Sequence, residues 1–239
     1  MIYILEDICK LLAVATADER KQLAEILGIE LDANSEPQKQ AEVLVRQLRW
    51  KYQTPLGYLI REPSFDEICI DVAKALNFEE LAKENTSCWT LLQRLIENML
   101  QTMWEQMSPE QREDFAKKVL TPDEFEWVSK GKSVDWGKVS AGSLLLGLKH
   151  FSGFFTYKIA VIIANQAARL LLRRGLSLAT NAALVRGLSI FIGPVGWLLT
   201  AWGINDLLGT NYKRIIPAVL YIYCIYQRLK EAGELPFEV

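Results

Sequence analysis

Helix start signals recur along the first half of the chain and constrain its fold more than any other feature. At Thr16 and Ser64 a hydroxyl residue is followed three positions later by a glutamate, which is the capping-box pattern. At Ser35, Ser108 and Thr121 a proline follows within two residues, where the first turn of a helix accepts it. Between these signals the apolar residues fall at helical spacing, and no stretch alternates as a strand does.

The predicted elements are therefore helices. We place them near residues 3–14, 17–27, 36–51, 65–76, 87–106, 109–119 and 122–129, and Gly28 ends the second. The predicted fold class is all-α: a multi-helix bundle with an acidic N-terminal part and a hydrophobic, basic C-terminal helical part. We divide it into a short N-terminal helical module at 1–32, an acidic helical domain at 33–129, and a basic hydrophobic helical region at 130–239 with a hairpin near 177–208.

Opposite charges are segregated along the chain. Residues 1–129 contain 24 Asp and Glu against 14 Lys and Arg, a net charge of −10. Residues 130–230 contain 13 Lys and Arg against two Asp, a net charge of +11. The basic part is also the more hydrophobic one, which favours anionic lipid over nucleic acid, because proteins that bind DNA are usually basic and polar. The alternative is that the two parts neutralise one another across an internal interface.

A long apolar segment of the basic part, residues 139–172, predicts one helix of about 50 Å. Its polar side chains, which include Lys158 and Arg169, form one narrow cationic face on a helical projection, and Arg173 directly after the segment extends this face. A wide apolar face with a cationic stripe is typical of a helix that lies on an anionic membrane. A central helix of a soluble bundle, covered by neighbours on all sides, explains the same pattern equally well.

A second apolar run, residues 188–204, contains no charge and is just long enough for a short membrane span. A Gly-Pro pair interrupts it, so we expect a helical hairpin rather than a straight span. The candidate contacts with a membrane or a protein partner are Lys158 and Arg169, the cations that flank the hairpin, the Gly-Pro turn and two tryptophans. Besides Lys158 and Arg169 they are Arg173, Arg174, Arg186, Gly193, Pro194, Trp197, Trp202, Lys213 and Arg214. A hairpin buried in a soluble core is the alternative.

The last predicted helix follows Lys213 and Arg214. Pro217 is expected in its first turn, where proline costs little. Its tyrosines lie among isoleucines, which gives an aromatic band, and we expect this helix to lie in the core.

Residues suited to catalysis or metal binding are scarce. The four cysteines have no CxxC spacing, and His150 is the only histidine. We therefore expect no metal, no cofactor and no enzymatic activity, and we expect the cysteines to be small buried side chains. Glu6 and Asp7 interrupt the first apolar run, so no cleaved export signal is predicted. The expected location is cytoplasmic, at the inner face of the cytoplasmic membrane if the chain contacts lipid.

Three stretches of the chain resemble the YaaW-like family of bacterial proteins. They are the opening MIYILEDICKLLAVATADERKQLAEIL, the central SFDEICIDVAKALNFEELAKENTSCWTLLQRLIENMLQTMWEQMSPEQREDF, and the later GPVGWLLTAWGINDLLGTNYKRIIPAVLYIYCIYQR. In the last, a Gly-Pro-Val-Gly turn precedes an Ile-Pro-Ala-Val helix. The family is grouped with the ubiquinol–cytochrome c chaperone domain, an all-helical domain involved in assembling a respiratory complex. The resemblance implies an assembly or interaction role and supplies no catalytic motif.

Two functions follow for a non-enzymatic helical protein. In the first, the basic hydrophobic C-terminal region associates with anionic membrane lipid or inserts into it, as a hairpin or pore-like element. In the second, which the resemblance suggests, the chain is a soluble chaperone or assembly factor that binds a protein partner. Nucleic acid is not expected as a partner, because the aromatic residues of the basic part lie among aliphatic ones. Homo-oligomerisation stays open.

Overall fold

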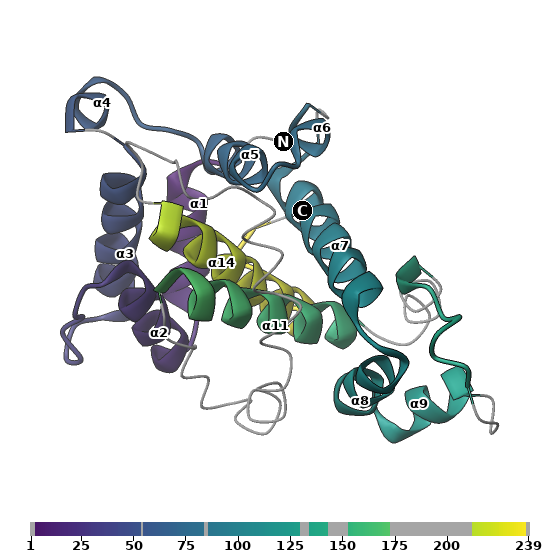
Figure 1. Ribbon diagram of the computed structural model, residues 1–239. Helices are drawn as coiled ribbons and strands as arrows, with labels where there is room; N and C mark the ends of the chain where they lie inside the picture. Colours follow the sequence, from purple (N-terminus) through teal and green to yellow (C-terminus); the bar gives the residue numbers. More distant parts are fainter. Residues whose placement is uncertain are drawn as a thin grey trace.

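Every regular element that the structure describes is an α-helix (Figure 1). The computed structural model describes residues 3–53, 55–83, 86–129, 134–142, 153–172 and 212–237. The helices are α1 (Leu5–Val14), α2 (Ala17–Leu27), α3 (Pro37–Tyr52), α4 (Pro55–Ile60), α5 (Phe65–Ala75), α6 (Glu79–Ala82), α7 (Cys88–Gln106), α8 (Pro109–Val119), α9 (Pro122–Ser129), α11 (Gly153–Leu172) and α14 (Tyr212–Ala232). The predicted all-α fold class is confirmed. Each helix predicted before residue 130 begins and ends within two residues of its expected boundaries.

The capping boxes explain why these boundaries are so well defined. At α2 the Glu19 amide donates to the Thr16 hydroxyl at 3.2 Å, and the Thr16 amide donates to the Glu19 carboxylate at 2.8 Å. Ser64 and Ser108 make the same reciprocal contacts at the starts of α5 and α8. Each box satisfies two amides that the first helical turn would otherwise leave without an acceptor.

Two predicted helix starts are wrong in detail. At α3 the cap is Glu36 rather than Ser35, because Pro37 takes the first helical position. At α14 the helix begins at Tyr212, so Pro217 lies inside the helix rather than in its first turn. Proline there donates no amide to the carbonyl four residues before it, which costs the helix one hydrogen bond. The short helices α4 and α6, six and four residues long, were not predicted, because they are too short to show a period.

The centre of the described fold is α14, which packs along α11 (Figure 1). From Ile215 to Gln227 every residue of α14 is buried, and so is every residue of α11 from Tyr157 to Ala168. Helices α1, α2, α3, α5 and α7 of the acidic part pack against α14. The prediction that the last helix lies in the core is confirmed. Residues 143–152 lie outside the described residues, so the single long helix predicted for 139–172 is observed only as α11.

Aromatic rings join the two ends of the chain to this core. The Trp89 ring of α7 stacks on the Tyr226 ring of α14, with centroids 3.9 Å apart and an interplanar angle of 2°. Tyr3 and Phe237 pack against each other with centroids 5.5 Å apart, and both contact Trp89. Such pairs add about 0.5–1.5 kcal/mol each beyond the area that they bury. All four cysteines are buried, as expected.

A half-buried ion pair ties α14 to α2. Arg228 donates from Nε to one Glu19 carboxylate oxygen at 2.6 Å and from Nη2 to the other at 2.8 Å. Glu19 is also the residue that completes the cap of α2. One carboxylate of the acidic part therefore starts a helix and neutralises a cation of the basic part.

The cap at the other end of α2 also contacts α14. Gly28 ends α2 in the left-handed region, at φ 71°, which glycine adopts without a steric cost. The Arg214 guanidinium lies so close to Gly28 that a Cβ at this position would overlap it. Its Nη1 donates to the Ile26 carbonyl at 2.8 Å. The missing side chain thus leaves the space in which a cation of α14 meets the carboxyl end of α2.

Among the helices that the structure describes, none combines the length and the apolar character needed to cross a bilayer.

Replacing Arg228 with alanine should lower the free energy of unfolding by about 2–3 kcal/mol, because it leaves the Glu19 carboxylate half-buried without its partner. Urea unfolding followed by far-ultraviolet circular dichroism measures the change. The control is Lys39→Ala, an exposed cation of α3 that lies 3.8 Å from the exposed Glu36 and should cost less than about 0.5 kcal/mol. Equal effects of the two substitutions would contradict the role given to the ion pair.

Alkaline pH should destabilise the fold between about pH 10 and 12. Burial raises the pKa of Tyr226 to about 12 from 10.0, and it raises the pKa values of Tyr221 and Tyr223 further. The unfolded chain loses these protons first, so stability is fully present below pH 10 and falls as the pH rises, by roughly 1.4 kcal/mol per pH unit for each tyrosine. Urea unfolding at several alkaline pH values measures this slope. Tyr226→Phe should reduce it, and an unchanged slope would show that Tyr226 already ionises in the folded protein.

Candidate functional site

The predicted site residues that the structure describes do not form one surface. Lys158 is only 8% exposed and donates from Nζ to the Val119 carbonyl at the end of α8, at 2.8 Å. Arg169 is half-buried on α11. Arg214 is engaged with Ile26, and Lys213 is exposed at the start of α14. Two positions were predicted for α11, on a membrane or at the centre of a bundle. In the described structure α11 is a central helix of the bundle.

The remaining predicted contacts fall on residues that the structure leaves undescribed. They are Arg173, Arg174, Arg186, Gly193, Pro194, Trp197 and Trp202, together with the hairpin expected near 177–208. Their contact with lipid or with a protein partner stays a prediction.

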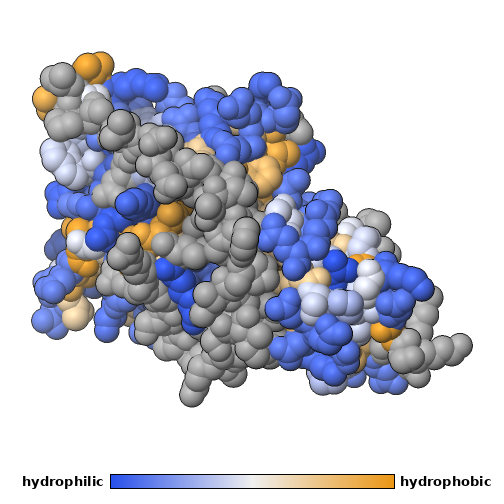
Figure 2. Space-filling view, in the orientation of Figure 1, coloured by the Kyte–Doolittle hydropathy of each residue, from blue (hydrophilic) through white to orange (hydrophobic). Residues whose placement is uncertain are grey.

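The described structure exposes a different apolar surface, at the end of α3 and on α4. Leu59 is 81% exposed, Ile60 is 79% exposed, and Trp50 of α3 is 51% exposed. Figure 1 shows α4 projecting from the upper left of the molecule, and Figure 2 shows hydrophobic surface at the same corner. Large apolar side chains gathered in this way mark surfaces that contact another molecule or a membrane.

Side chains of α3 hold α4 in place. Arg49 donates from Nη2 to the Tyr58 carbonyl at 2.7 Å and to the Arg61 carbonyl at 3.2 Å. Gln53 donates to the Arg61 carbonyl as well, at 2.9 Å. The Tyr58 ring stacks under the Arg49 guanidinium, 4.2 Å from its centroid, and meets the Trp50 ring edge-on at 5.2 Å. The carbonyls of Tyr58 in α4 and of Arg61 directly after it thereby accept hydrogen bonds from Arg49 and Gln53, which tie this short helix to the end of α3.

Cations surround this surface. Residues 43–61 contain Arg46, Arg49, Lys51 and Arg61 and no Asp or Glu, within an N-terminal part that is otherwise acidic. Burial, and after it the Arg214 charge, lower the pKa of Lys51, so the start of α14 lies close to the end of α3. We call this corner the α4 end. It comprises the exposed residues Arg46, Trp50, Leu59, Ile60 and Arg61, the half-buried Lys51, and the nearby exposed Lys213 at the start of α14.

Acidic groups only partly offset these cations. Arg61 pairs with Glu67 at 2.8 Å, and Arg49 lies 3.9 Å from Glu62. Lys51 and Lys213 make no ion pair with any residue that the structure describes. The α4 end is therefore both apolar and positively charged.

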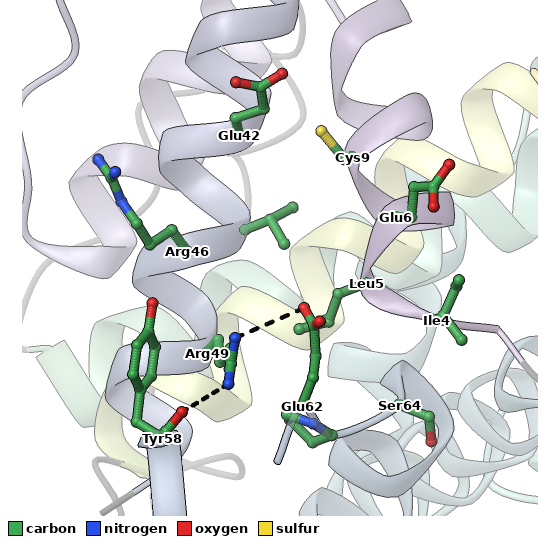
Figure 3. Close-up of a pocket in the computed structure, with 12 residues that line it drawn as sticks. Ile4, Leu5, Glu6, Cys9, Glu42, Arg46, Arg49, Tyr58, Glu62 and Ser64 are labelled. Atoms are coloured by element: carbon green, nitrogen blue, oxygen red, sulfur yellow. Dashed lines mark hydrogen bonds and ion pairs between the residues drawn. The ribbon is translucent and has the colours of Figure 1, made fainter. Parts of the chain in front are cut away.

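A cavity of about 540 Å³ opens beside the α4 end, between α1, α3 and α4 (Figure 3). In Figure 3, Glu42, Arg46 and Arg49 follow one another along α3, opposite Cys9 and Glu6 of α1. The walls of the cavity combine apolar side chains with charges of both signs. They are formed by Ile4, Leu5, Glu6, Cys9, Glu42, Val45, Arg46, Arg49, Tyr58, Glu62, Pro63 and Ser64. Such a cavity suits a ligand with its own charges of both signs.

Cys9 is the thiol of this cavity. Burial raises its pKa, the Glu42 carboxylate raises it further, and a hydrogen bond from Gln38 at 3.5 Å opposes them. A thiol held in its neutral form is a poor nucleophile. No group of His, Cys, Asp and Glu among the described residues could hold a metal ion.

Neither the α4 end nor the cavity was predicted from the sequence. The signal for the α4 end is the acid-free run 43–61, in which Trp50, Tyr52 and Tyr58 alternate with cations inside a strongly acidic region. The cavity had no comparable signal, because its walls come from three helices that pattern analysis treats separately.

In the native protein Cys9 should react with a maleimide before the other three thiols, which are 0–1% exposed. Glu42→Gln should speed this labelling near pH 8, because removing the carboxylate lowers the Cys9 pKa. Labelling rates measured by mass spectrometry at several pH values test this. The matched control Glu36→Gln changes an exposed glutamate at the start of α3, outside the cavity, and should leave the rate unchanged. Labelling of Cys69, Cys88 or Cys224 before Cys9 would contradict the geometry.

Comparison with known proteins identifies relatives along most of the chain. A UPF0174 protein of Helicobacter pylori (strain J99 / ATCC 700824) is 31% identical over 199 residues, which cover 82% of this chain and 74% of the relative. A second UPF0174 protein of the same strain is 26% identical over 168 residues, covering 70% of this chain and 77% of the relative. The UPF0174 protein YaaW of Escherichia coli (strain K12) is 27% identical over 158 residues, 66% of this chain and 58% of the relative.

No family model and no solved structure matches the chain. The resemblance to YaaW-like proteins is confirmed at the level of the family, while the grouping with the ubiquinol–cytochrome c chaperone domain stays a prediction. The chain belongs to the UPF0174 family.

Proposed function

We propose that this protein is a non-enzymatic helical protein that associates with anionic membranes through the α4 end. The observation that carries the proposal is the exposure of Trp50, Leu59 and Ile60 at the α4 end, where Lys51 and Lys213 make no ion pair with any described residue. Apolar side chains provide free energy by leaving water, and cations are attracted to the negative leaflet. The α4 end provides both on one surface.

The apolar contribution is substantial for so small a surface. Fully burying a leucine or isoleucine side chain is worth about 1.5–3 kcal/mol. Leu59 and Ile60 are close to fully exposed, so most of that free energy is available to a contact. Trp50 and Tyr58 have the amphipathic rings that are enriched at the level of lipid headgroups. Leu59 and Ile60 would thus contact the hydrocarbon, and Trp50 and Tyr58 would lie at the level of the headgroups.

The electrostatic contribution has the sign required for anionic lipid. A lysine or arginine near an anionic leaflet contributes about 1 kcal/mol. Lys51 and Lys213 are free of ion pairs among the described residues, so they keep their charge available. The remaining surface of the N-terminal part is acidic, which orients the protein with the α4 end toward the membrane.

This proposal moves the lipid contact away from the helices first considered for it. In the described structure α11 and α14 are the core of the bundle, and Lys158, Arg214 and Arg228 have partners inside the protein. Of the cations predicted to contact lipid, Lys213 belongs to the α4 end. We also keep the prediction that residues 173–211 contact lipid; these residues lie outside the part of the chain that the structure describes.

A second candidate function is binding of a protein partner, as expected of an assembly factor. The observation that favours it is the cavity beside the α4 end, whose apolar walls and mixed charges resemble those of a protein interface. The same exposed residues would then contact a polypeptide instead of lipid.

Vesicle flotation with the full chain tests the first function. The protein should float with vesicles that contain phosphatidylglycerol, and replacing Trp50, Leu59 and Ile60 with serine should weaken binding by about tenfold or more. The control Val14→Ser changes an apolar residue that is 48% exposed at the end of α1 and should bind as the unaltered protein does.

The charge contribution is tested in the same assay. Lys51→Glu combined with Lys213→Glu should reduce binding, and added salt should do the same. Lys83→Glu combined with Lys117→Glu makes the same change in net charge at exposed positions on α8 and beside α6, and should have a smaller effect. Recovery of the unaltered protein in the soluble fraction with every lipid mixture would exclude the membrane function and leave the partner-binding one.

A further inference from the structure

The cavity and the apolar tip share a wall. Tyr58 lines the cavity, and its ring contacts Trp50 of the α4 end at 5.2 Å. We propose that the cavity binds the headgroup of a zwitterionic phospholipid with a primary ammonium, namely phosphoethanolamine. This inference rests on the proposed function, because the headgroup reaches the cavity from a membrane held at the α4 end.

The charges available to such a ligand are Glu42 and Arg46. Both are exposed, and they lie one turn apart on α3, a rise of about 6 Å. Neither makes an ion pair with the other or with any other residue that the structure describes. Opposite charges four residues apart on a helix commonly pair with each other. Glu42 accepts a hydrogen bond from Gln38 at 3.1 Å but has no cationic partner among the described residues, and Arg46 has no anionic one. One charge of each sign in the cavity wall is therefore available to a ligand.

The other charged side chains of the cavity already have partners. Glu6 pairs with Lys10 at 3.1 Å, and Arg49 is bound to the carbonyls of Tyr58 and Arg61. These contacts fix the walls, so Glu42 and Arg46 are the wall charges that have no ion-pair partner among the described residues, and they select the ligand.

Phosphoethanolamine carries charges of the matching kind, a phosphate joined through two carbons to an ammonium. The ammonium donates to the Glu42 carboxylate, and the phosphate accepts from the Arg46 guanidinium, which are both charge-assisted hydrogen bonds. Ile4, Val45 and Pro63 provide apolar wall for the carbon atoms between and beyond these groups.

The carboxylates also decide which headgroups are disfavoured. The carboxylates of Glu6, Glu42 and Glu62 make the electrostatic potential in the cavity more negative, which disfavours a headgroup that carries only negative charge. A trimethylated ammonium, as in phosphatidylcholine, has no hydrogen to donate to Glu42. The cavity therefore distinguishes two lipids of equal net charge by a hydrogen bond.

Two sets of vesicles with the same fraction of phosphatidylglycerol test this, one completed with phosphatidylethanolamine and the other with phosphatidylcholine. The full chain should bind the first about fivefold more tightly, as expected for two partly exposed charge contacts. Glu42→Gln should abolish this preference, measured as the ratio of the two affinities, because the loss of one negative charge otherwise affects both sets of vesicles equally. Arg46→Gln should weaken the preference. Glu36→Gln, outside the cavity on the same helix, should keep it in full.

Each outcome separates this inference from the function on which it rests. Equal binding of the unaltered chain to both sets would overturn the headgroup site and leave membrane association standing. A preference for phosphatidylethanolamine that survives Glu42→Gln would overturn the site as well, because it would reflect the packing of the bilayer rather than recognition in the cavity. Binding to neither set would remove the membrane function itself, and the headgroup site with it.

Discussion

The burial of α14 is the constraint on which the rest of the described structure depends. A helix with a continuous buried stretch from Ile215 to Gln227 must be covered on every side, and α11 and five helices of the acidic part provide that cover. Its two arginines are then the difficult groups, because each lies where water is partly excluded. Glu19 neutralises Arg228, and the carboxyl end of α2 receives Arg214. The charge segregation of the sequence thus becomes an internal interface between the described helices.

This arrangement shows why hydropathy and charge alone could not place α11. A helix in the centre of a bundle and a helix on a membrane share a wide apolar face and a few cations. What distinguishes them is the partner of each cation. Lys158 bonds a carbonyl 39 residues away, and Arg214 bonds one 188 residues away. A pattern within one segment contains no information on such distant acceptors, so both interpretations were open until the helices were placed together.

Local signals, in contrast, predicted the helices closely. The boxes at Thr16, Ser64 and Ser108 act within four residues, so the sequence contains the whole interaction and the observed contacts follow it. Exposure, in contrast, depends on how distant helices pack, and no local signal contains it. Leu59 and Ile60 are ordinary apolar residues in the sequence, and only the position of α4 shows that they are 81% and 79% exposed. The α4 end and its cavity were therefore missed, although the acid-free run around Trp50 could have indicated a special surface.

The exposed apolar side chains of the α4 end are not explained by packing, as those of the core are. The contacts that hold α4 against α3 do not involve Leu59 and Ile60. Arg49 and Gln53 bind the carbonyls at the end of α4, and Tyr58 packs on Arg49. The side chains of Leu59 and Ile60 take part in none of these contacts. Two aliphatic side chains left in water forgo about 1.5–3 kcal/mol each. A rigidly held helix that leaves this free energy unused gains it only when another phase or molecule covers the tip, and the adjacent cations make an anionic bilayer the cover with matching charge.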